Sequence, residues 1–190
     1  WGQGITLGEA EKEFKAFIEK AGIPSASTLL GLSALESDHE LHVGMVGMHG
    51  HYAPNKLTNE CDVLIAIGMR FDDRVTGNLQ TYAKQAKVIH FEIDPSEVDK
   101  NVKTDIAVLG NVKQTLAEII PKIEKKERKS WLKEFNDLYE IEFKEVIQAQ
   151  VHANGDGLTM AETLMALNKA TKGEAVVVSD VGQHQMVASR

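Results

Sequence analysis

The sequence predicts an α/β fold: a doubly wound parallel sheet flanked by helices. An uninterrupted apolar run at residues 62–68 ends in glycine, which is typical of a parallel strand buried on both faces. Strand-like runs also alternate along the chain with stretches of helical periodicity. Glycine or proline ends these runs at Gly68, Pro95 and Gly110. Such an alternation places parallel strands side by side and crossover helices on the faces of the sheet.

The first elements follow from spacing and from chain breakers. Gly2-Gln3-Gly4 follows what we expect to be a largely truncated first strand. Residues 9–21 carry an apolar stripe at helical spacing, and Gly22 ends the predicted helix. Residues 25–30 follow a proline and predict a short strand.

Residues 87–95 and 105–109 predict two further strands, and residues 114–125 a helix with one apolar face. A long helix is expected over 131–148, another over 159–169, and a last strand over 175–178. The charge run at 124–129 is typical of a solvated surface. We therefore predict an α/β domain over residues 1–125, a helical linker over 126–156, and the start of a second domain over 157–190.

Composition excludes several classes of protein. The 190 residues carry a net charge of −7 and are 43% hydrophobic and 26% charged, as in ordinary globular domains. The absence of a basic cluster argues against nucleic acid or an anionic membrane surface as a partner. The longest apolar run is too short to cross a bilayer. One cysteine, Cys61, excludes a disulfide framework and predicts a buried thiol in a reducing compartment, the cytoplasm.

Because the sequence starts at Trp1 and ends at Arg190, we expect a fragment of a longer protein.

Polar side chains and glycines gather where the predicted strands end. Ligands of open parallel sheets bind at the carboxyl ends of the strands. There glycine lets backbone approach a phosphate, arginine pairs with phosphate oxygens, and carboxylates accept from ribose hydroxyls. The sequence therefore predicts a dinucleotide site, although Gly-x-Gly is a common turn, the charged groups can form surface ion pairs, and Glu92 and Asp94 can be caps. The residues are Gly2, Gly4, Thr28, Leu29, Gly68, Arg70, Asp72, Asp73, Arg74, Val75, Glu92, Ile93, Asp94, Gly110 and Asn111.

Four histidines lie within residues 38–52, which makes a metal site the alternative interpretation of this segment. The glycines between them predict a flexible loop, with no acidic or cysteine partner at a usual ligand spacing. We favour a loop at residues 44–50 that approaches a flat ligand, with Met48 packing on a ring. No metal is expected there.

Several runs resemble one family. Residues 44–50, the run Arg-Phe-Asp-Asp-Arg-Val-Thr-Gly at 70–77, the pattern Ile-x-x-x-Ile-Asp-Pro at 89–95, Lys100-Asn101-Val102, and residues 179–186 carry the resemblance. The chain resembles the catalytic large subunits of acetolactate (acetohydroxyacid) synthases over nearly its whole length. The run at 70–77 points to the FAD-containing biosynthetic branch.

The resemblance implies a Rossmann-like, FAD-binding central domain followed by the start of a pyrophosphate-binding domain. Such transferases join a hydroxyethyl group from pyruvate to pyruvate or 2-oxobutyrate on thiamine diphosphate with Mg²⁺, in branched-chain amino acid biosynthesis. Their FAD has no net redox role. A homodimer or larger assembly, 2-oxo acid substrates, the rest of the parent chain and a small regulatory subunit are the implied partners.

Site residues carry over position by position. The implied flavin contacts are Gly2, Gly4, Thr28, Leu29, Met48, His49, Gly68, Arg70, Asp72, Arg74, Val75, Glu92, Ile93 and Gly110. Val181, Gly182, Gln183 and His184 are implied near thiamine diphosphate. Asn111 stands where the family commonly has Asp, and Val187 where it has Trp. Gly155-Asp156-Gly157 looks like the family's Mg²⁺ motif, but no Asn follows at the required distance, so we interpret it as a turn.

The resemblance places the activating glutamate and the Mg²⁺ site outside this sequence. We therefore expect no catalytic residue in the chain, no catalysis by the chain alone, and weak or absent FAD binding. A free-standing nucleotide- or FAD-binding module with a regulatory or structural role is the alternative. A dinucleotide-dependent dehydrogenase ranks last, since the glycine spacing and a proton relay are lacking.

Overall fold

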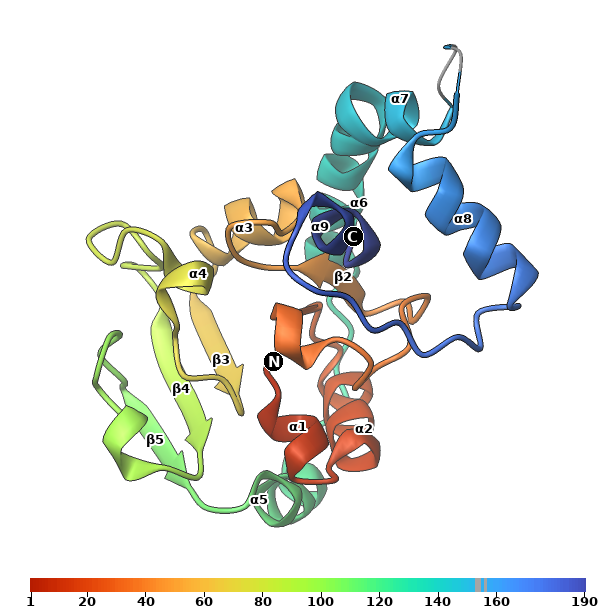
Figure 1. Ribbon diagram of the computed structural model, residues 1–190. Coiled ribbons are helices and arrows are strands. Elements are labelled where there is room, and N and C mark those ends of the chain that lie inside the picture. Colours follow the sequence, from red (N-terminus) through yellow and green to blue (C-terminus); the bar gives the residue numbers. More distant parts are fainter. Residues whose placement is uncertain (153–154, 156) are drawn as a thin grey trace.

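The computed structural model describes residues 1–152, 155 and 157–190. It contains two parallel sheets (Figure 1). One pairs β1 (Ser25–Ser27) with β2 (His42–Met45), and the other has the order β3 (Val63–Ile67), β4 (Lys87–Glu92), β5 (Ile106–Leu109). All pairings are parallel, with Val63 opposite Lys87 and Ile89 opposite Ile106. The predicted α/β class is confirmed.

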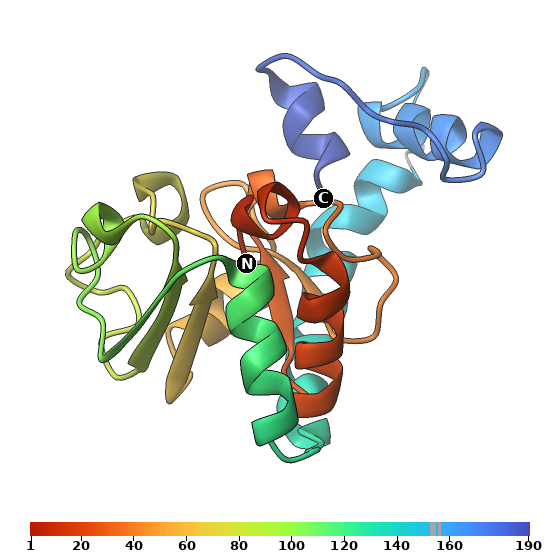
Figure 2. The same cartoon turned by 90° about the horizontal axis from the view of Figure 1, so that it is seen from below.

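Helices lie on both faces of these strands, as a doubly wound arrangement requires. On one face α1 (Gly4–Leu7), α2 (Glu11–Ala21) and α5 (Val112–Ile119) surround the main core, and α2 and α5 run side by side (Figure 2). On the other, α3 (Tyr52–Thr58) packs with α6 (Lys129–Glu142). The remaining elements are α4 (Asp73–Thr76), α7 (Gln148–Val151), α8 (Met160–Ala170), α9 (Gln183–Ala188), the 3₁₀ turns Leu29–Gly31, Pro95–Glu97 and Ile120–Lys122, and the π-turn Phe143–Ile147.

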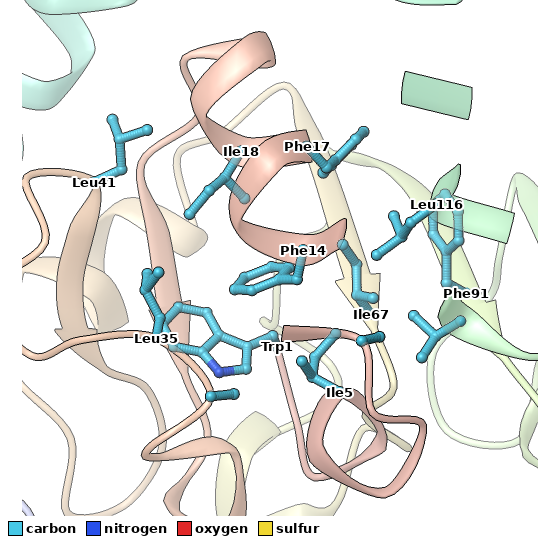
Figure 3. Packing of buried hydrophobic residues seen from close by; sticks show 13 residues of the cluster. Trp1, Ile5, Phe14, Phe17, Ile18, Leu35, Leu41, Ile67, Phe91 and Leu116 are labelled. Carbon is cyan, nitrogen blue, oxygen red and sulfur yellow. The ribbon is translucent and has the colours of Figure 1, made fainter. Parts of the chain in front are cut away.

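The main core sits between α2 and the strands. Phe14 and Ile18 from α2 meet Ile67 of β3 and Leu116 of α5, all almost fully buried (Figure 3). The Trp1 indole lies 4.9 Å from the Phe14 ring. On the other face of the sheet, Ala66 of β3 and Val88 of β4 form a second buried cluster with Phe71. β4 therefore has buried side chains on both faces, and His90 is the polar one among them.

Local sequence explains the element ends. Gly22 adopts a left-handed conformation (φ +61°) and its N–H donates to the Ile18 carbonyl, which ends α2 as predicted. Asn111 Oδ1 accepts from the N–H groups of Lys113 and Gln114, so α5 begins at Val112 rather than at residue 114. Pro121 follows shortly, and the chain passes into a 3₁₀ turn instead of continuing to residue 125.

Several predictions about strands and loops need correction. Residues 175–178 form no strand; Val176 and Val178 are about nine-tenths exposed, because no described strand lies beside them. The segment 38–52 is not all loop, since β2 runs through it. The strand at 62–68 is not buried throughout, because Val63 is 42% exposed at an open sheet edge.

The predicted long helix at 131–148 starts earlier and contains a break. α6 begins at Lys129, and a π-turn at residues 143–147 separates it from α7. The short strand at 25–30 also stops at Ser27, where Thr28 caps a 3₁₀ turn by accepting from the Gly31 N–H. Within the described residues no helix is long and apolar enough to cross a bilayer.

Candidate functional site

Hydrogen bonds join the strand ends into one row. The Thr28 N–H donates to the Trp1 carbonyl (2.8 Å) and the Gly2 N–H to the Ile67 carbonyl (3.0 Å). The row continues from the Gly68 N–H to Phe91 (2.9 Å) and from the Gly110 N–H to Glu92 (3.0 Å). The predicted loops therefore lie on one edge, in the order Thr28, Gly2, Gly68, Glu92, Gly110.

Glycines in this row allow close packing of backbone on backbone. A Cβ on Gly4 would lie 2.6 Å from the Gly68 Cα, and one on Gly2 would lie 2.5 Å from the Gly68 carbonyl oxygen. Gly68 itself has φ +59°, and its Cβ would lie 2.7 Å from the Gly4 Cα. These glycines allow α1 to dock onto the end of β3. Their predicted contact with a phosphate stays a prediction.

Residues 70–75 form a rigid corner after β3. Asp72 caps α4 by accepting from the Arg74 N–H (3.1 Å), and it pairs with the Arg70 guanidinium (2.8 Å). The hydrogen bond from the Arg74 N–H is the main cause that lowers the pKa of the Asp72 carboxyl below its usual range. The nearby Arg70 guanidinium lowers it further. The surface ion pair that the sequence analysis gave as an alternative is therefore formed between Arg70 and Asp72. The Arg74 side chain is exposed.

A buried aromatic group anchors this corner. Phe71 is 1% exposed at φ +51° and packs edge-on against His90, with ring centroids 5.0 Å apart. His90 Nε2 lies 2.7 Å from the Met69 carbonyl oxygen, which makes that nitrogen the donor, and Asn101 Nδ2 donates to the Phe71 carbonyl. Sequence reasoning missed Phe71, His90 and Asn101, because a single sequence carries no signal for contacts between distant segments.

The loop at 44–50 reaches the same corner. The Met48 N–H donates to the Arg74 carbonyl (2.7 Å), and the Met48 side chain is 62% exposed. Gly47, the residue before Met48, is bound by the Asn55 side chain of α3. The Asn55 Oδ1 accepts from the Gly47 N–H (2.8 Å), and its Nδ2 donates to the Gly47 carbonyl (2.9 Å). A cavity of about 290 Å³ lies where the two loops meet, and it is lined by Met48, Arg74 and Val75 among others. The sequence analysis did not predict the role of Asn55 in placing this loop.

The ends of β4 and β5 complete the row. Glu92 Oε1 accepts from the N–H groups of Ile93 (2.8 Å) and Asp94 (3.2 Å), so this carboxylate caps the turn, as the simpler interpretation proposed. Asp94 caps the next turn, where hydrogen bonds from the side chain and the N–H of Ser96 lower the pKa of its carboxyl. Exposed apolar side chains border the row, namely Leu29 and Ile93.

The four histidines point to different partners. His39 pairs with Glu19 (3.1 Å), and His42 Nδ1 lies near the Glu36 carbonyl. His51 Nδ1 accepts from the Met45 N–H, while His49 is exposed. In the part of the chain that the structure describes, no three His, Cys, Asp or Glu side chains gather to hold a metal ion.

Val181, Gly182, Gln183 and His184 lie apart from the row, at the start of α9. Val181 is 89% exposed, and His184 Nε2 pairs with Asp180 (2.7 Å). Among the described residues, none of the hydrogen bonds or ion pairs of these four residues reaches a strand-end loop. The Gly155–Gly157 motif includes Asp156, which lies outside the described residues.

The fold and the row of loops agree with one family. The family model described as "Thiamine pyrophosphate enzyme, central domain" matches residues 1–119. The chain belongs to this family. That match covers α1 to α5 and every strand, and hence all of the strand-end row.

Curated relatives of this thiamine pyrophosphate enzyme domain share a name. The chain is similar to the acetolactate synthase large subunit of Lactococcus lactis subsp. lactis, 40% identical over 187 residues, covering 97% of the chain and 32% of the relative. It is 37% identical over 185 residues to that of Buchnera aphidicola subsp. Schizaphis graminum, with the same coverage, and 36% over 194 residues to that of Corynebacterium glutamicum, covering 100% and 30%. The chain thus spans about a third of the length of these relatives.

Proposed function

We propose that this chain is the flavin-binding middle part of an acetolactate synthase large subunit, a transferase of branched-chain amino acid biosynthesis. The observation that supports this most directly is the joined row of strand-end loops, in a chain whose similarity to such subunits covers 97% of its length or more. The substrates would be pyruvate and a second 2-oxo acid, pyruvate or 2-oxobutyrate.

The residues of the row suit FAD in chemical type. Exposed guanidinium groups at Arg70 and Arg74 suit a diphosphate, and the exposed apolar side chains of Leu29, Met48 and Ile93 suit a flat ring system. Asp72 and Glu92 are already used as caps, so in this proposal they shape the loops and need no bond to the ligand. FAD would be held here without taking part in net redox chemistry.

Thiamine diphosphate and Mg²⁺ belong to the second part of the proposal. When bound, thiamine diphosphate supplies the carbanion chemistry of the family. Gly182 and the side chains of Gln183 and His184 would meet its pyrophosphate from the start of α9. Those side chains are exposed, and residues 174–180 before the helix form neither helix nor strand, so they would be accessible to a cofactor held between chains.

Residues 1–125 would be the central domain, 126–156 a helical linker, and 157–190 the start of the pyrophosphate-binding domain. The working enzyme would be a cytoplasmic homodimer or larger assembly that a small subunit regulates. The charge of −7 gives no basic surface for nucleic acid.

Titration of the ¹⁵N-labelled chain with FAD tests the flavin site. We expect weak binding, with amide shifts concentrated at residues 68–75, 92–94 and 110. Arg74→Ala should weaken binding, whereas Lys125→Ala, which removes an exposed charge at the end of the central domain, should leave it unchanged. Shifts confined to other parts of the chain would contradict the site, and tight, stoichiometric FAD binding would favour a free-standing module.

A further inference from the structure

A buried carboxylate lies on the face of α6 that packs against α3. Glu142, the last residue of α6, follows Phe135 by about two helical turns, so both side chains lie on the side of α3. The Glu142 side chain is only 5% exposed. A carboxylate taken out of water is costly unless other groups satisfy it, so its partners show what this position does.

Glu142 binds two segments that lie far from it in the sequence. Its Oε2 accepts from the N–H of Tyr52, the first residue of α3 (2.8 Å). His51, which precedes α3, makes no side-chain cap bond, so Glu142 supplies an acceptor at the start of this helix. The other oxygen, Oε1, pairs with the guanidinium of Arg190, just beyond α9. One buried carboxylate thus joins α6, α3 and the end of α9 (Figure 1).

His51 connects this group to the loop at 44–50. Its N–H donates to the Met45 carbonyl (2.8 Å) and its Nδ1 accepts from the Met45 N–H (3.1 Å), so His51 closes the loop at its base. Because Nδ1 is the acceptor, Nε2 carries the proton and donates to the Arg190 carbonyl (3.2 Å). One buried imidazole therefore contacts both the loop that carries Met48 and the end of α9.

We propose that Glu142 is a positioning residue that holds α9 against the base of the loop at 44–50. With His51, Tyr52 and Arg190 it forms a group that we call the junction. Its role rests on the proposed function, in which the loop contacts FAD and the start of α9 meets thiamine diphosphate. The junction sets how these two cofactor regions lie relative to each other.

α9 depends on such a contact. It has six residues, none of them buried, and a helix this short is unstable in water by itself. The Arg190 side chain is 29% exposed, whereas its partner Glu142 is almost fully buried. Breaking the ion pair therefore leaves an uncompensated carboxylate inside the molecule and removes a polar anchor of α9.

Residue-level amide exchange tests the junction without any added cofactor, so the result does not depend on whether the chain binds FAD. Glu142→Gln keeps an acceptor for the Tyr52 N–H but removes the charge that pairs with Arg190. We expect the amides at residues 187–189 to exchange at least about tenfold faster, and the Met45 amide to shift. The amides of β3 should not change, which separates release of α9 from a loss of overall stability.

Glu140→Gln is the matched control for the carboxylate. Glu140 lies on the same helix, is 63% exposed and pairs with Lys144 at 4.0 Å. Since an exposed pair of this kind contributes little, its loss should leave exchange in α9 unchanged.

Arg190→Met is the second arm, which decides the matter if Glu142→Gln does not fold. It should speed exchange in α9 as Glu142→Gln does, and it should also shift the Met45 amide, which the structure connects to Arg190 through His51. Arg190→Lys should restore part of the protection because it keeps the charge. The double variant Glu142→Gln/Arg190→Met should exchange no faster than either single variant, because both remove the same interaction.

Unchanged exchange of α9 in both single variants, equal acceleration by Glu140→Gln, or additive effects in the double variant would overturn the proposal. Release of α9 with an unchanged Met45 amide would also overturn it, because the junction would then not reach the loop. None of these results would bear on the flavin site, which the FAD titration tests separately.

Discussion

At the scale of single residues, a few backbone positions decide whether the strand-end row exists. Gly68 is held at φ +59° against Gly4 with no room for a side chain. Phe71 also has a positive φ, and its buried ring is kept in place by His90. By comparison, the charged side chains of the loop at residues 70–75 are less buried: Arg70 and Arg74 are exposed, and Asp72 is half-buried. The loop therefore depends on residues that do not resemble ligand contacts.

Replacement of Gly68 by alanine should be severe. Gly77 has nearly the same φ, +58°, but nothing lies within 4 Å of a Cβ built there. Gly77→Ala thus measures the conformational cost alone, and Gly68→Ala adds overlap with the Gly4 backbone. We expect Gly68→Ala to lower the free energy of unfolding by about 1–3 kcal/mol more than Gly77→Ala, measured by urea denaturation. Equal losses would show that α1 does not pack on Gly68.

Buried bases should make the chain sensitive to mild acid. Burial lowers the pKa of His51, whose Nδ1 must stay unprotonated to accept from Met45, and it also lowers the pKa of His42. The unfolded chain then binds protons that the folded chain excludes, so stability is full above the unfolded pKa and falls as the pH drops through about 6.5. The Trp1 amine acts in the same direction between pH 8 and about 5.

Thermal unfolding between pH 8 and 5 measures this dependence. His51→Asn should make the fall in melting temperature with decreasing pH shallower, although it also removes a bond to Met45. His49→Asn is the control, because His49 is exposed and should not change the slope. A pH-independent melting temperature in the unmodified chain would contradict the assignment.

At the scale of elements, α6 shows how the predicted linker attaches to the sheet domain. Phe135 is 7% exposed and packs with Ala53 and Leu57 of α3, next to Trp131, whose ring centroid lies 5.4 Å away. Glu142 at the end of α6 accepts from the Tyr52 N–H (2.8 Å) and pairs with Arg190. The helix is thus docked by an apolar seam and a buried carboxylate.

Phe135→Ala should remove most of the apolar contact between α6 and α3. We expect a loss of about 3 kcal/mol in the free energy of unfolding, since a large buried ring leaves a cavity. Tyr139→Ala is the matched control on the same helix, because Tyr139 is 43% exposed, and its cost should be below about 1 kcal/mol. Similar losses for both variants, by urea denaturation, would show that α6 is not docked through Phe135.

At the scale of the whole molecule, the proposed flavin and thiamine diphosphate contacts occupy separate places. The former follow the strand ends, and the latter lie at the start of α9, which comes after α8 in the chain (Figure 1). The chain also spans only about a third of its curated relatives. Catalysis would therefore need groups supplied by other parts of a full-length subunit.

The purified chain should form no acetolactate from pyruvate with thiamine diphosphate, Mg²⁺ and FAD. A full-length large subunit assayed in parallel is the positive control, and the colorimetric detection of acetolactate is the measurement. Turnover by a clean preparation of the chain would show that it holds complete catalytic machinery, contrary to the proposal.

Local patterns in the sequence determined much of the fold. The stripe ending at Gly22, the run at 62–68 and the breakers after β4 and β5 act over a few residues, so α2, β3, β4 and β5 were predicted near their observed places. The alignment of strand ends on one edge was also predictable, because parallel strands share a direction.

Only the tertiary structure decided the rest. Whether residues 175–178 become a strand depends on a neighbour, not on their β-branched side chains, and no described strand lies beside them. The role of Gly4 depends on a contact with the distant Gly68, and the position of Gly47 depends on Asn55, eight residues further along the chain. Helices and turns depend on interactions between residues close in the sequence, which local patterns predict. Pairing between strands depends on where the fold places segments that are far apart in the sequence.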